Sequence, residues 1–328
     1  MKIGVVGCGA LGSFYGAKLW QAGHDVHFLL RSDYDVVRAH GVQIESEDGN
    51  FTARPQAART GEEIGVCDVV LIGLKTTANS AFAELLPPLV DGRTAVLTLQ
   101  NGLGNEEAMA KLFSTEQILG GLCFVCLNRI RPGLVRHLGH GFIVIGEFGR
   151  PPLPRTQTLA EMFQQAGVKC SVSEDLGRAH WEKLVWNVPF NGLGVAGLAG
   201  IDAMATGVVP RQITRRDCLA TDELLGDPQW TEFVRGLMLE VIHAAGKLGH
   251  SLPDTLADKM IERTRTMGDY RASTLIDFER GQPLELESLF LEPLRQAEQA
   301  GARVPLLKKL CVVLTELDRR RAAAGSNA

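Results

Sequence analysis

The sequence predicts an α/β fold in its first half and a second, all-helical domain. Short apolar, strand-like runs alternate with helical patterns over residues 1–173. From residue 174 onward the periodicity is almost entirely helical. The length of 328 residues suits about two domains, at roughly 150 residues each. We therefore expect an α/β domain at 1–173 and a helical domain at 174–328.

Composition and charge exclude several classes of protein. Hydrophobic residues make up 45% of the chain, and the formal net charge of −4 argues against a general nucleic-acid binder. No apolar stretch approaches the roughly 18 residues of a membrane span, and Met1-Lys2 leads directly into a strand-like run, so no signal peptide is expected. Seven scattered cysteines suggest no disulfide framework and fit a reducing cytoplasm.

The chain begins with a strand at 2–6, a glycine-rich loop, a helix at 13–22 and a second strand at 25–30. The loop is a complete G-x-G-x-x-G motif made of Gly7, Cys8, Gly9, Ala10, Leu11 and Gly12. In this order of elements the motif predicts a Rossmann-type dinucleotide-binding domain. Gly7 permits the tight turn, Gly9 lets the backbone approach a pyrophosphate, and Gly12 lets helix and strand pack closely. The free N–H groups at the start of the helix then bind the phosphates.

The end of the second strand predicts which dinucleotide binds. An NAD site usually places a carboxylate there to hold the ribose 2′-hydroxyl. Here Arg31 and Ser32 follow the strand, and a cation and a hydroxyl suit a 2′-phosphate, so we expect NADP. Asp33 comes slightly late for the ribose and is expected to cap the next helix instead.

Two further strands, at 66–74 and 95–99, end in polar residues. Lys75 follows the first strand, and Asn101 follows the second within Q-N-G-L-G. Because ligands bind beyond the carboxyl ends of strands in open α/β sheets, both residues are candidates for the same crevice as the glycine loop. A solvated lysine and an ordinary Asn-Gly turn are the alternatives.

The segments 117–128 and 134–146 predict a hairpin that closes the first domain. The turn Arg131-Pro132-Gly133 separates them. Cys123 and Cys126 form a C-x-x-C pair within the first segment, but there is no second pair. We expect them to be small residues of a buried strand and expect no metal site.

The second half is expected to form helices at 174–200, 211–225, 229–249, 253–280 and 285–322, with fraying from residue 322 on. Lys183, Asn187 and Asn191 recur at every fourth position of the first helix, so they share one face. Pro189 is expected to bend this helix. The lysine is able to stabilise negative charge on a reacting carbonyl oxygen and to deliver a proton, and the asparagines are able to donate hydrogen bonds. The alternative is a lysine that reaches solvent beside asparagines that bond neighbouring loops.

At this point the chain resembles the ketopantoate reductase family (2-dehydropantoate 2-reductases) along nearly its whole length. The matching pieces are G-C-G-A-L-G at 7–12, Arg31, G-L-K ending at Lys75, Q-N-G-L-G from Gln100, W-E-K-L-V-W-N-V-P-F-N-G at 181–192, S-T-L-I-D-F-E-R-G from Ser273 and E-L-E from Glu285. The resemblance implies a Rossmann domain followed by a helical domain, NADPH as cofactor, and reduction of a 2-oxo acid.

The resemblance also implies a role for each matching residue. Lys183 matches a catalytic lysine, and Glu285 a glutamate near that lysine and the cofactor ribose. The residues matching substrate contacts are Asn187, Asn191 and Ser273, and Asn101 matches a residue near both substrate and nicotinamide ribose. Lys75 matches a cofactor-side lysine, and Cys126 a small residue whose backbone meets the cofactor.

Three departures from the family pattern lie on the expected substrate side. Tyr270 stands where the family often has asparagine, Gly192 where proline often follows the last asparagine, and residues 290–293 replace an N-G pair. The expected reaction is NADPH-dependent reduction of ketopantoate to pantoate, in pantothenate and coenzyme A biosynthesis. The alternatives are another 2-oxo or 3-hydroxy acid, or a non-enzymatic NADP-binding regulator. A homodimer is also possible.

Overall fold

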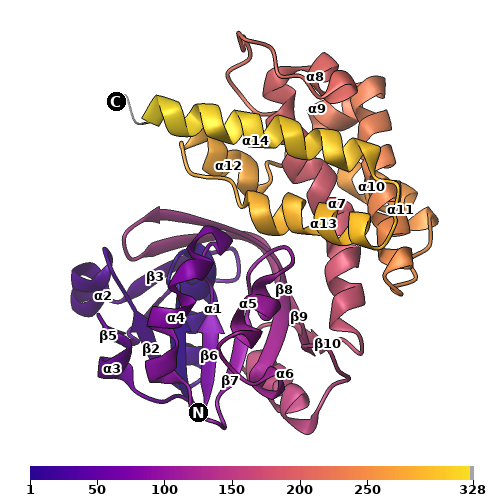
Figure 1. Ribbon diagram of the computed structural model, residues 1–328. Coiled ribbons are helices and arrows are strands. Elements are labelled where there is room, and N and C mark those ends of the chain that lie inside the picture. Colours follow the sequence, from indigo (N-terminus) through magenta and orange to yellow (C-terminus); the bar gives the residue numbers. More distant parts are fainter. Residues whose placement is uncertain (326–328) are drawn as a thin grey trace. The chain divides into compact units, whose positions relative to one another are not determined.

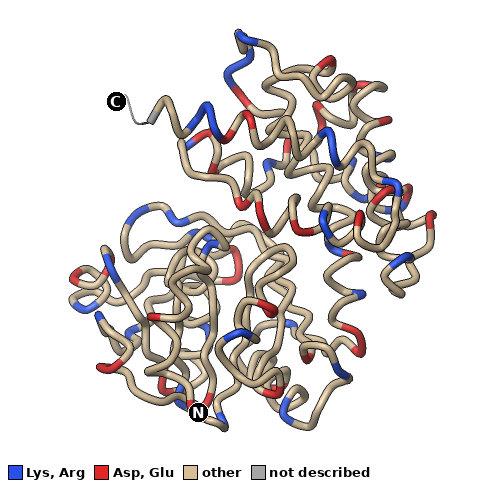
Figure 2. Tube along the Cα trace, viewed as in Figure 1, with Lys and Arg blue, Asp and Glu red and all other residues tan. Residues whose placement is uncertain are grey.

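The computed structural model describes residues 1–325 and divides into two compact units (Figure 1). The first unit spans Met1–Leu176, and the second begins at Gly177. This division lies close to the boundary expected between 173 and 174. Within residues 1–325, no helix is long and apolar enough to cross a membrane. Lys and Arg as well as Asp and Glu are distributed over both units (Figure 2).

The first unit is built on one mixed sheet. Its strands are β1 (Lys2–Val6), β2 (Asp25–Leu29), β3 (Val42–Ser46), β4 (Phe51–Ala53), β5 (Gln56–Ala58), β6 (Val69–Ile72), β7 (Ala95–Thr98), β8 (Ile118–Arg131), β9 (Leu134–Glu147) and β10 (Cys170–Val172). The strands β5-β2-β1-β6-β7-β8 lie side by side in this order, and every neighbouring pair among them is parallel. This is the strand order of a Rossmann sheet, so the predicted α/β fold is confirmed.

The helices of this unit cover both faces of the sheet. They are α1 (Ala10–Gln21), α2 (Tyr34–His40), α3 (Gly61–Ile64), η1 (Thr76–Ala81), α4 (Phe82–Leu85), η2 (Pro87–Leu89), α5 (Asn105–Ala110), η3 (Thr115–Gln117) and α6 (Pro154–Gln165). Alternate residues of a strand point to opposite faces. Accordingly, Val69 and Leu71 of β6 join one hydrophobic core with α1 and α6, while Val70 and Ile72 join another with α4 and α5.

The predicted hairpin forms, but it does not close the unit. β8 pairs antiparallel with β9. The other edge of β9 is used as well, because its first residues pair with β3 and its later ones with β10. The hairpin therefore joins the parallel sheet to β10 and to β3, of which β3 was not predicted from the sequence. Cys123 is buried and Cys126 is half-buried within β8, as strand residues outside any disulfide.

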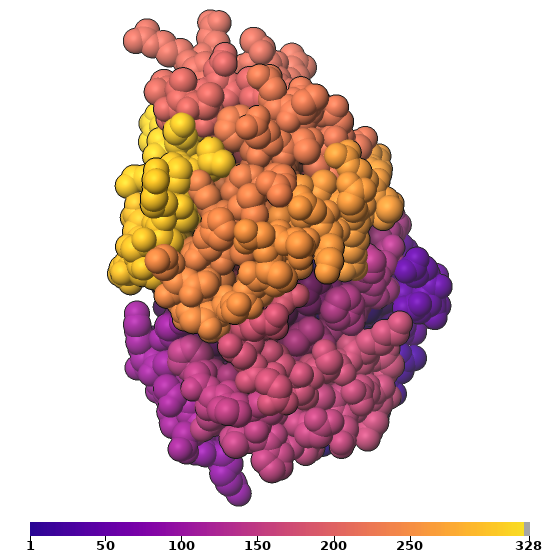
Figure 3. Space-filling view, turned by 90° about the vertical axis from the view of Figure 1, so that its right-hand side faces the viewer, coloured from indigo at the N-terminus to yellow at the C-terminus, as the bar shows by residue number. Residues whose placement is uncertain are grey.

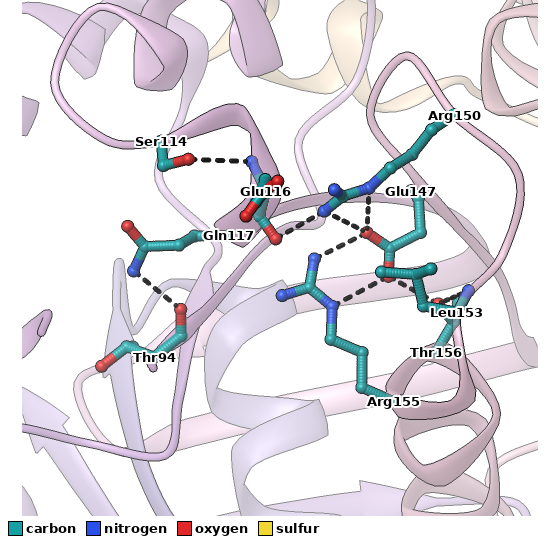
Figure 4. Close-up of polar contacts among 9 residues, drawn as sticks. All are labelled: Thr94, Ser114, Glu116, Gln117, Glu147, Arg150, Leu153, Arg155 and Thr156. Atoms are coloured by element: carbon teal, nitrogen blue, oxygen red, sulfur yellow. Dashed lines mark hydrogen bonds and ion pairs between the residues drawn. The ribbon is translucent and has the colours of Figure 1, made fainter. Parts of the chain in front are cut away.

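A buried carboxylate ties the end of β9 to α6 (Figure 4). The Glu147 side chain is fully buried. It accepts hydrogen bonds from Arg155 at 2.6 Å, Thr156 at 2.6 Å and Arg150 at 3.1 Å. Burial alone would raise the pKa of Glu147, but the bonds from Arg155 and Thr156 outweigh it and leave that pKa lowered. The carboxylate thus stays charged in the interior.

The second unit is helical, with boundaries that differ from the prediction. Its elements are α7 (Leu176–Ala196), η4 (Gly197–Ala199), α8 (Ile201–Thr206), α9 (Thr221–Gly226), α10 (Pro228–Lys247), α11 (Thr255–Arg265), α12 (Ser273–Glu279), the π-turn η5 (Glu287–Leu291), α13 (Glu292–Gln299) and α14 (Pro305–Gly325). The helix predicted at 229–249 is confirmed as α10. The helix predicted at 211–225 is wrong over most of its length, and those predicted at 253–280 and 285–322 are broken. α14 lies along one side of this unit (Figure 3) and continues to Gly325, and the fraying expected for 326–328 falls outside the described residues.

Glycines let α7 pack closely on its neighbours within the second unit. A Cβ at Gly192 would lie 2.6 Å from Leu310 and 2.9 Å from Phe290. A Cβ at Gly194 would lie 2.7 Å from Leu275. The backbone of α7 therefore touches side chains of α12, η5 and α14. This contact explains why Gly192, rather than proline, follows Asn191.

Candidate functional site

The three glycines of the loop lie in different surroundings. Gly7 has a φ of +94°, and a Cβ there would lie 2.2 Å from the Leu74 amide nitrogen. A Cβ at Gly12 would lie 2.3 Å from the Gly7 carbonyl oxygen. By contrast, a Cβ at Gly9 would meet no protein atom within 4 Å. Packing requires Gly7 and Gly12, whereas Gly9 leaves open space for a ligand to approach the backbone.

The start of α1 offers hydrogen-bond donors beside this space. Gly9 is the N-cap residue, and no side chain caps the helix. Free N–H groups at a helix start, together with the positive end of the dipole, bind phosphate. The loop itself is braced, because Ser13 Oγ donates to the Cys8 carbonyl at 3.0 Å. Burial raises the pKa of the Cys8 thiol well above its ordinary value, so Cys8 is a neutral loop residue.

Lys75 lies where the strand order reverses. β1 and β6 are neighbours in the sheet. The next strand after β1 along the chain, β2, lies on the far side of β1, whereas the next strand after β6, β7, lies on the far side of β6. A Cβ at Gly73, just beyond β6, would lie 2.9 Å from the Gly12 nitrogen, so this segment packs directly on the glycine loop. Lys75 follows two residues later, is exposed and is the N-cap residue of η1. The segment before Lys75 therefore packs on the glycine loop, and the cofactor contact expected of Lys75 stays a prediction.

Asn101 is held by a chain of amides that the sequence analysis did not identify. Gln100 Nε2 donates to Asn79 Oδ1 at 2.7 Å, and Asn79 Nδ2 donates to Asn105 Oδ1 at 2.9 Å. Asn105 Nδ2 in turn donates to the Asn101 carbonyl at 3.2 Å. The chain fastens η1, after β6, to the loop after β7. It thereby fixes the backbone of Asn101 at the carboxyl edge of the sheet.

Arg31 and its neighbours form the end of the site that follows β2. Arg31 is exposed, and within residues 1–325 its side chain makes no hydrogen bond or ion pair. Ser32 Oγ donates to Asp33 Oδ1 at 2.9 Å. Asp33 occupies the N-cap position of α2, but its side chain makes no capping bond there. The predicted capping role is wrong because Arg129 binds this carboxylate instead.

Cys126 lies in β8 opposite Gly139, beside an irregularity in the β8–β9 pairing. Its predicted role, a backbone contact with the cofactor, stays a prediction.

The first unit thus combines an open glycine loop, an uncapped helix start and an exposed cation after β2. These features fit a nicotinamide dinucleotide.

In the second unit, α7 carries the predicted polar face. Lys183 is half-buried, while Asn187 and Asn191 are 8% and 4% exposed. Asn191 Nδ2 donates to the Asn187 carbonyl at 3.0 Å, which places the two asparagines one turn apart on the same face. Pro189 lies within the continuous helix. The three polar residues are therefore brought together, as their spacing predicts.

The elements that carry Ser273 and Glu285 both pack against α7. Ser273 is exposed and begins α12, whose Leu275 contacts Gly194. Glu285 is 7% exposed and lies just before η5, whose Phe290 contacts Gly192. A π-turn in such a position often accompanies a functional residue. The second unit thus collects all five predicted residues on α7 and on the elements that cover it.

Aromatic side chains border the polar face of α7. The ring of Trp186 lies 4.9 Å from Phe190 and 6.1 Å from Tyr270, centroid to centroid. Trp186 Nε1 donates to Thr264 Oγ1 at 2.9 Å, and Thr221 Oγ1 donates to the Tyr270 carbonyl at 3.1 Å. The first bond holds the Trp186 ring, and the second holds the backbone of Tyr270. The sequence analysis noted Tyr270 but missed Trp186, although its position three residues after Lys183 places it beside that face.

Comparisons with known proteins match both units. A family model described as "Ketopantoate reductase PanE/ApbA" matches residues 3–150, and its C-terminal counterpart, "Ketopantoate reductase PanE/ApbA C terminal", matches residues 214–318. A 2-dehydropantoate 2-reductase of Nostoc sp. is 40% identical over 326 residues, covering 97% of this chain and 96% of the relative.

Solved structures agree with this assignment. The crystal structure of 2-dehydropantoate 2-reductase from Geobacter metallireducens GS-15 is 44% identical, with a TM-score of 0.87, and the match covers 96% of this chain and 99% of that one. The corresponding enzyme from Methylococcus capsulatus is 32% identical, with a TM-score of 0.87 and 98% coverage of both chains. The chain described here belongs to the ketopantoate reductase family.

Proposed function

We propose that this chain reduces a 2-oxo acid to a 2-hydroxy acid with NADPH, and that its substrate is 2-dehydropantoate (ketopantoate). The observation that carries the proposal is the face of α7 with Lys183, Asn187 and Asn191, in a chain whose other unit holds an open glycine loop. The name of the Nostoc relative supports the choice of substrate. The reaction would provide pantoate for pantothenate and coenzyme A biosynthesis.

The proposed chemistry divides between the cofactor and the side chains. NADPH, when bound, supplies a hydride to the carbonyl carbon of the acid. The Lys183 ammonium stabilises the negative charge that develops on the carbonyl oxygen and then gives that oxygen its proton. Asn187, Asn191 and Ser273 orient the acid by hydrogen bonds, and Glu285 orients Lys183. Asn101 is proposed to lie near both the substrate and the nicotinamide ribose.

NADP is favoured over NAD by the residues after β2. Arg31 is exposed and offers its guanidinium to a 2′-phosphate, and Ser32 adds a hydroxyl. The pyrophosphate would meet Gly7, Cys8, Gly9, Ala10, Leu11 and Gly12, and Lys75 would approach the cofactor from the loop after β6. The cytoplasmic location and the homodimer expected from the sequence stay predictions.

Replacing Lys183 tests the proposed catalytic role. We expect Lys183→Ala to lower kcat by at least about a hundredfold, the lower range for loss of a general acid, while NADPH binding is kept. Steady-state oxidation of NADPH with ketopantoate and a direct titration of NADPH measure the two effects. Lys259→Ala, on an exposed position of α11, is the matched control. Full activity of Lys183→Ala would refute the assignment.

A second candidate substrate is favoured by the aromatic pair Trp186–Tyr270. These rings border the polar face and suit an acid with a bulkier or more apolar group. If they select such an acid, Tyr270→Asn should shift the ratio of kcat/KM values toward ketopantoate by about tenfold, the scale of one or two methylene contacts. A panel of 2-oxo acids measures this ratio, and Phe233→Asn on α10 is the control. An unchanged ratio removes Tyr270 from substrate selection.

The panel also tests the non-enzymatic alternative. A regulator would bind NADPH without oxidising it in the presence of any acid of the panel. Turnover of ketopantoate alone would favour the first proposal, and turnover of other acids alone would favour the second.

A further inference from the structure

The carboxylate of Asp33 is buried in the segment that follows β2, two residues beyond Arg31. Asp33 is 7% exposed. Arg129 binds it through two N–H groups: Nε donates to Oδ2 at 3.2 Å, and Nη2 donates to Oδ1. Ser32 Oγ also donates to Oδ1 at 2.9 Å, and the Gly133 amide donates to Oδ2 at 3.4 Å. Both oxygens of the carboxylate are therefore engaged by protein donors.

This carboxylate belongs to the neighbourhood of the glycine loop. The negative charge of Asp33 raises the pKa of the Cys8 thiol, second in size to the effect of burial. Arg129 and Gly133 reach Asp33 from the end of β8 and from the turn after it, which lie far along the chain. The β8–β9 hairpin thus returns to the segment that is proposed to meet the cofactor ribose.

The ion pair between Arg129 and Asp33 changes the charge that a nucleotide ribose would meet after β2. A carboxylate after the second strand of a Rossmann sheet suits the 2′-hydroxyl of NAD and opposes the 2′-phosphate of NADP. Here the fork of the Arg129 guanidinium neutralises the charge and holds both oxygens. The Arg129 side chain is still 40% exposed. The charges of Arg31, Asp33 and Arg129 therefore sum to +1 at this end of the site, whereas Arg31 and Asp33 alone would sum to 0.

We propose that Arg129 is a positioning residue for cofactor choice, which selects NADPH over NADH by restraining Asp33. The proposal rests on the NADPH-dependent function proposed above. Arg129 acts through Asp33 and not through a bond to the phosphate. Once released, the carboxylate would turn toward the ribose, repel a 2′-phosphate and accept a hydrogen bond from a 2′-hydroxyl.

The test measures dissociation constants for NADPH and NADH by isothermal titration, without turnover. The proteins are the wild type, Arg129→Gln, Asp33→Asn and the double variant Asp33→Asn/Arg129→Gln. Arg136→Gln is the control. Arg136 lies in β9 of the same hairpin and forms an ion pair with Glu45 of β3. Circular dichroism checks that each variant is folded. If Arg129→Gln does not fold, Arg129→Lys takes its place, since an ammonium cannot hold two oxygens as a fork.

We expect Arg129→Gln to lower the preference for NADPH by about tenfold, as expected for one unit charge a few ångströms from a phosphate in a partly solvated site. Asp33→Asn and the double variant should keep the preference of the wild type. An unchanged preference in folded Arg129→Gln would overturn the proposal. An equal loss in the double variant would also overturn it, because Arg129 would then act on the phosphate directly. A wild type that binds neither nucleotide would instead refute the proposed function itself.

Discussion

Glu147 illustrates how single residues keep a charge inside this fold. Its carboxylate is fully buried, yet two arginines and Thr156 surround it (Figure 4). Removing a charge from water costs several kcal/mol unless hydrogen bonds replace the lost hydration. The two arginines are partly exposed, at 24% and 31%, so their own desolvation is smaller. The cluster therefore fastens β9 to α6 without leaving a buried group unsatisfied.

This cluster predicts a particular dependence of stability on pH. Because the pKa of Glu147 in the folded state lies below its ordinary value of 4.5, its contribution is present above that value and is lost as the pH falls through the folded-state pKa. Glu147→Gln should lower the free energy of unfolding by about 2 kcal/mol at pH 7, the scale of hydrogen bonds to charged groups. Urea unfolding at pH 7 and pH 3 measures this. If the difference in unfolding free energy between variant and wild type is as large at pH 3 as at pH 7, the prediction is contradicted.

At the scale of elements, the glycine loop and α1 combine two different demands. Gly12 is needed because a Cβ at this position of α1 would lie 2.3 Å from the Gly7 carbonyl oxygen. Gly9 meets no such limit from the protein. The same motif thus contains one position set by helix packing and one left open toward solvent.

The two glycines should therefore respond differently to an added methyl group. Gly12→Ala should lower the thermal midpoint by several degrees, since backbone atoms must move to admit the Cβ. Gly9→Ala should leave the midpoint unchanged and weaken NADPH binding by at least about tenfold, because the methyl group occupies the space of the pyrophosphate. Differential scanning calorimetry and nucleotide titration separate the two effects. Equal effects of both substitutions on the midpoint would show that Gly9 is also a packing position.

Local patterns predicted the elements whose hydrogen bonds are local or periodic. The glycine loop, the β8–β9 hairpin and the polar face of α7 follow from short-range spacing. A helix was predicted at 211–225, but over 211–220 the backbone bonds to distant groups instead: the Leu219 amide donates to the Gly194 carbonyl, and the Cys218 amide to Glu279. The Arg129–Asp33 pair joins residues far apart in sequence. Such contacts leave no signal in the spacing of nearby residues, so neither could be predicted from them.

At the scale of the whole molecule, each unit has its own set of predicted contacts. The first unit carries the glycine loop, Arg31, Lys75 and Asn101, and the second carries Lys183 and the other residues of the α7 face. Each unit should therefore respond mainly to a different ligand, although Asn101 of the first unit and Glu285 of the second match residues near both. Binding stabilises the segments that it contacts against local opening.

Hydrogen exchange followed by mass spectrometry tests this division of ligands. NADP⁺ alone should slow exchange at least about threefold at residues 7–16 and 98–105, since about 0.6 kcal/mol of added local stability is enough. Ketopantoate added afterwards should slow exchange in α7 and near residue 273. Protection of α7 by NADP⁺ equal to that of the glycine loop would contradict separate sets of contacts.

The chain passes from one unit to the other once, at Leu176–Gly177 in the first turn of α7. Among residues 177–325, no segment supplies a strand to the sheet. A single genetic crossover there would exchange a complete nucleotide-binding unit and leave the polar face of α7 intact. Most of the contacts proposed for the cofactor and most of those proposed for the acid would then be inherited on two separate, continuous stretches of gene.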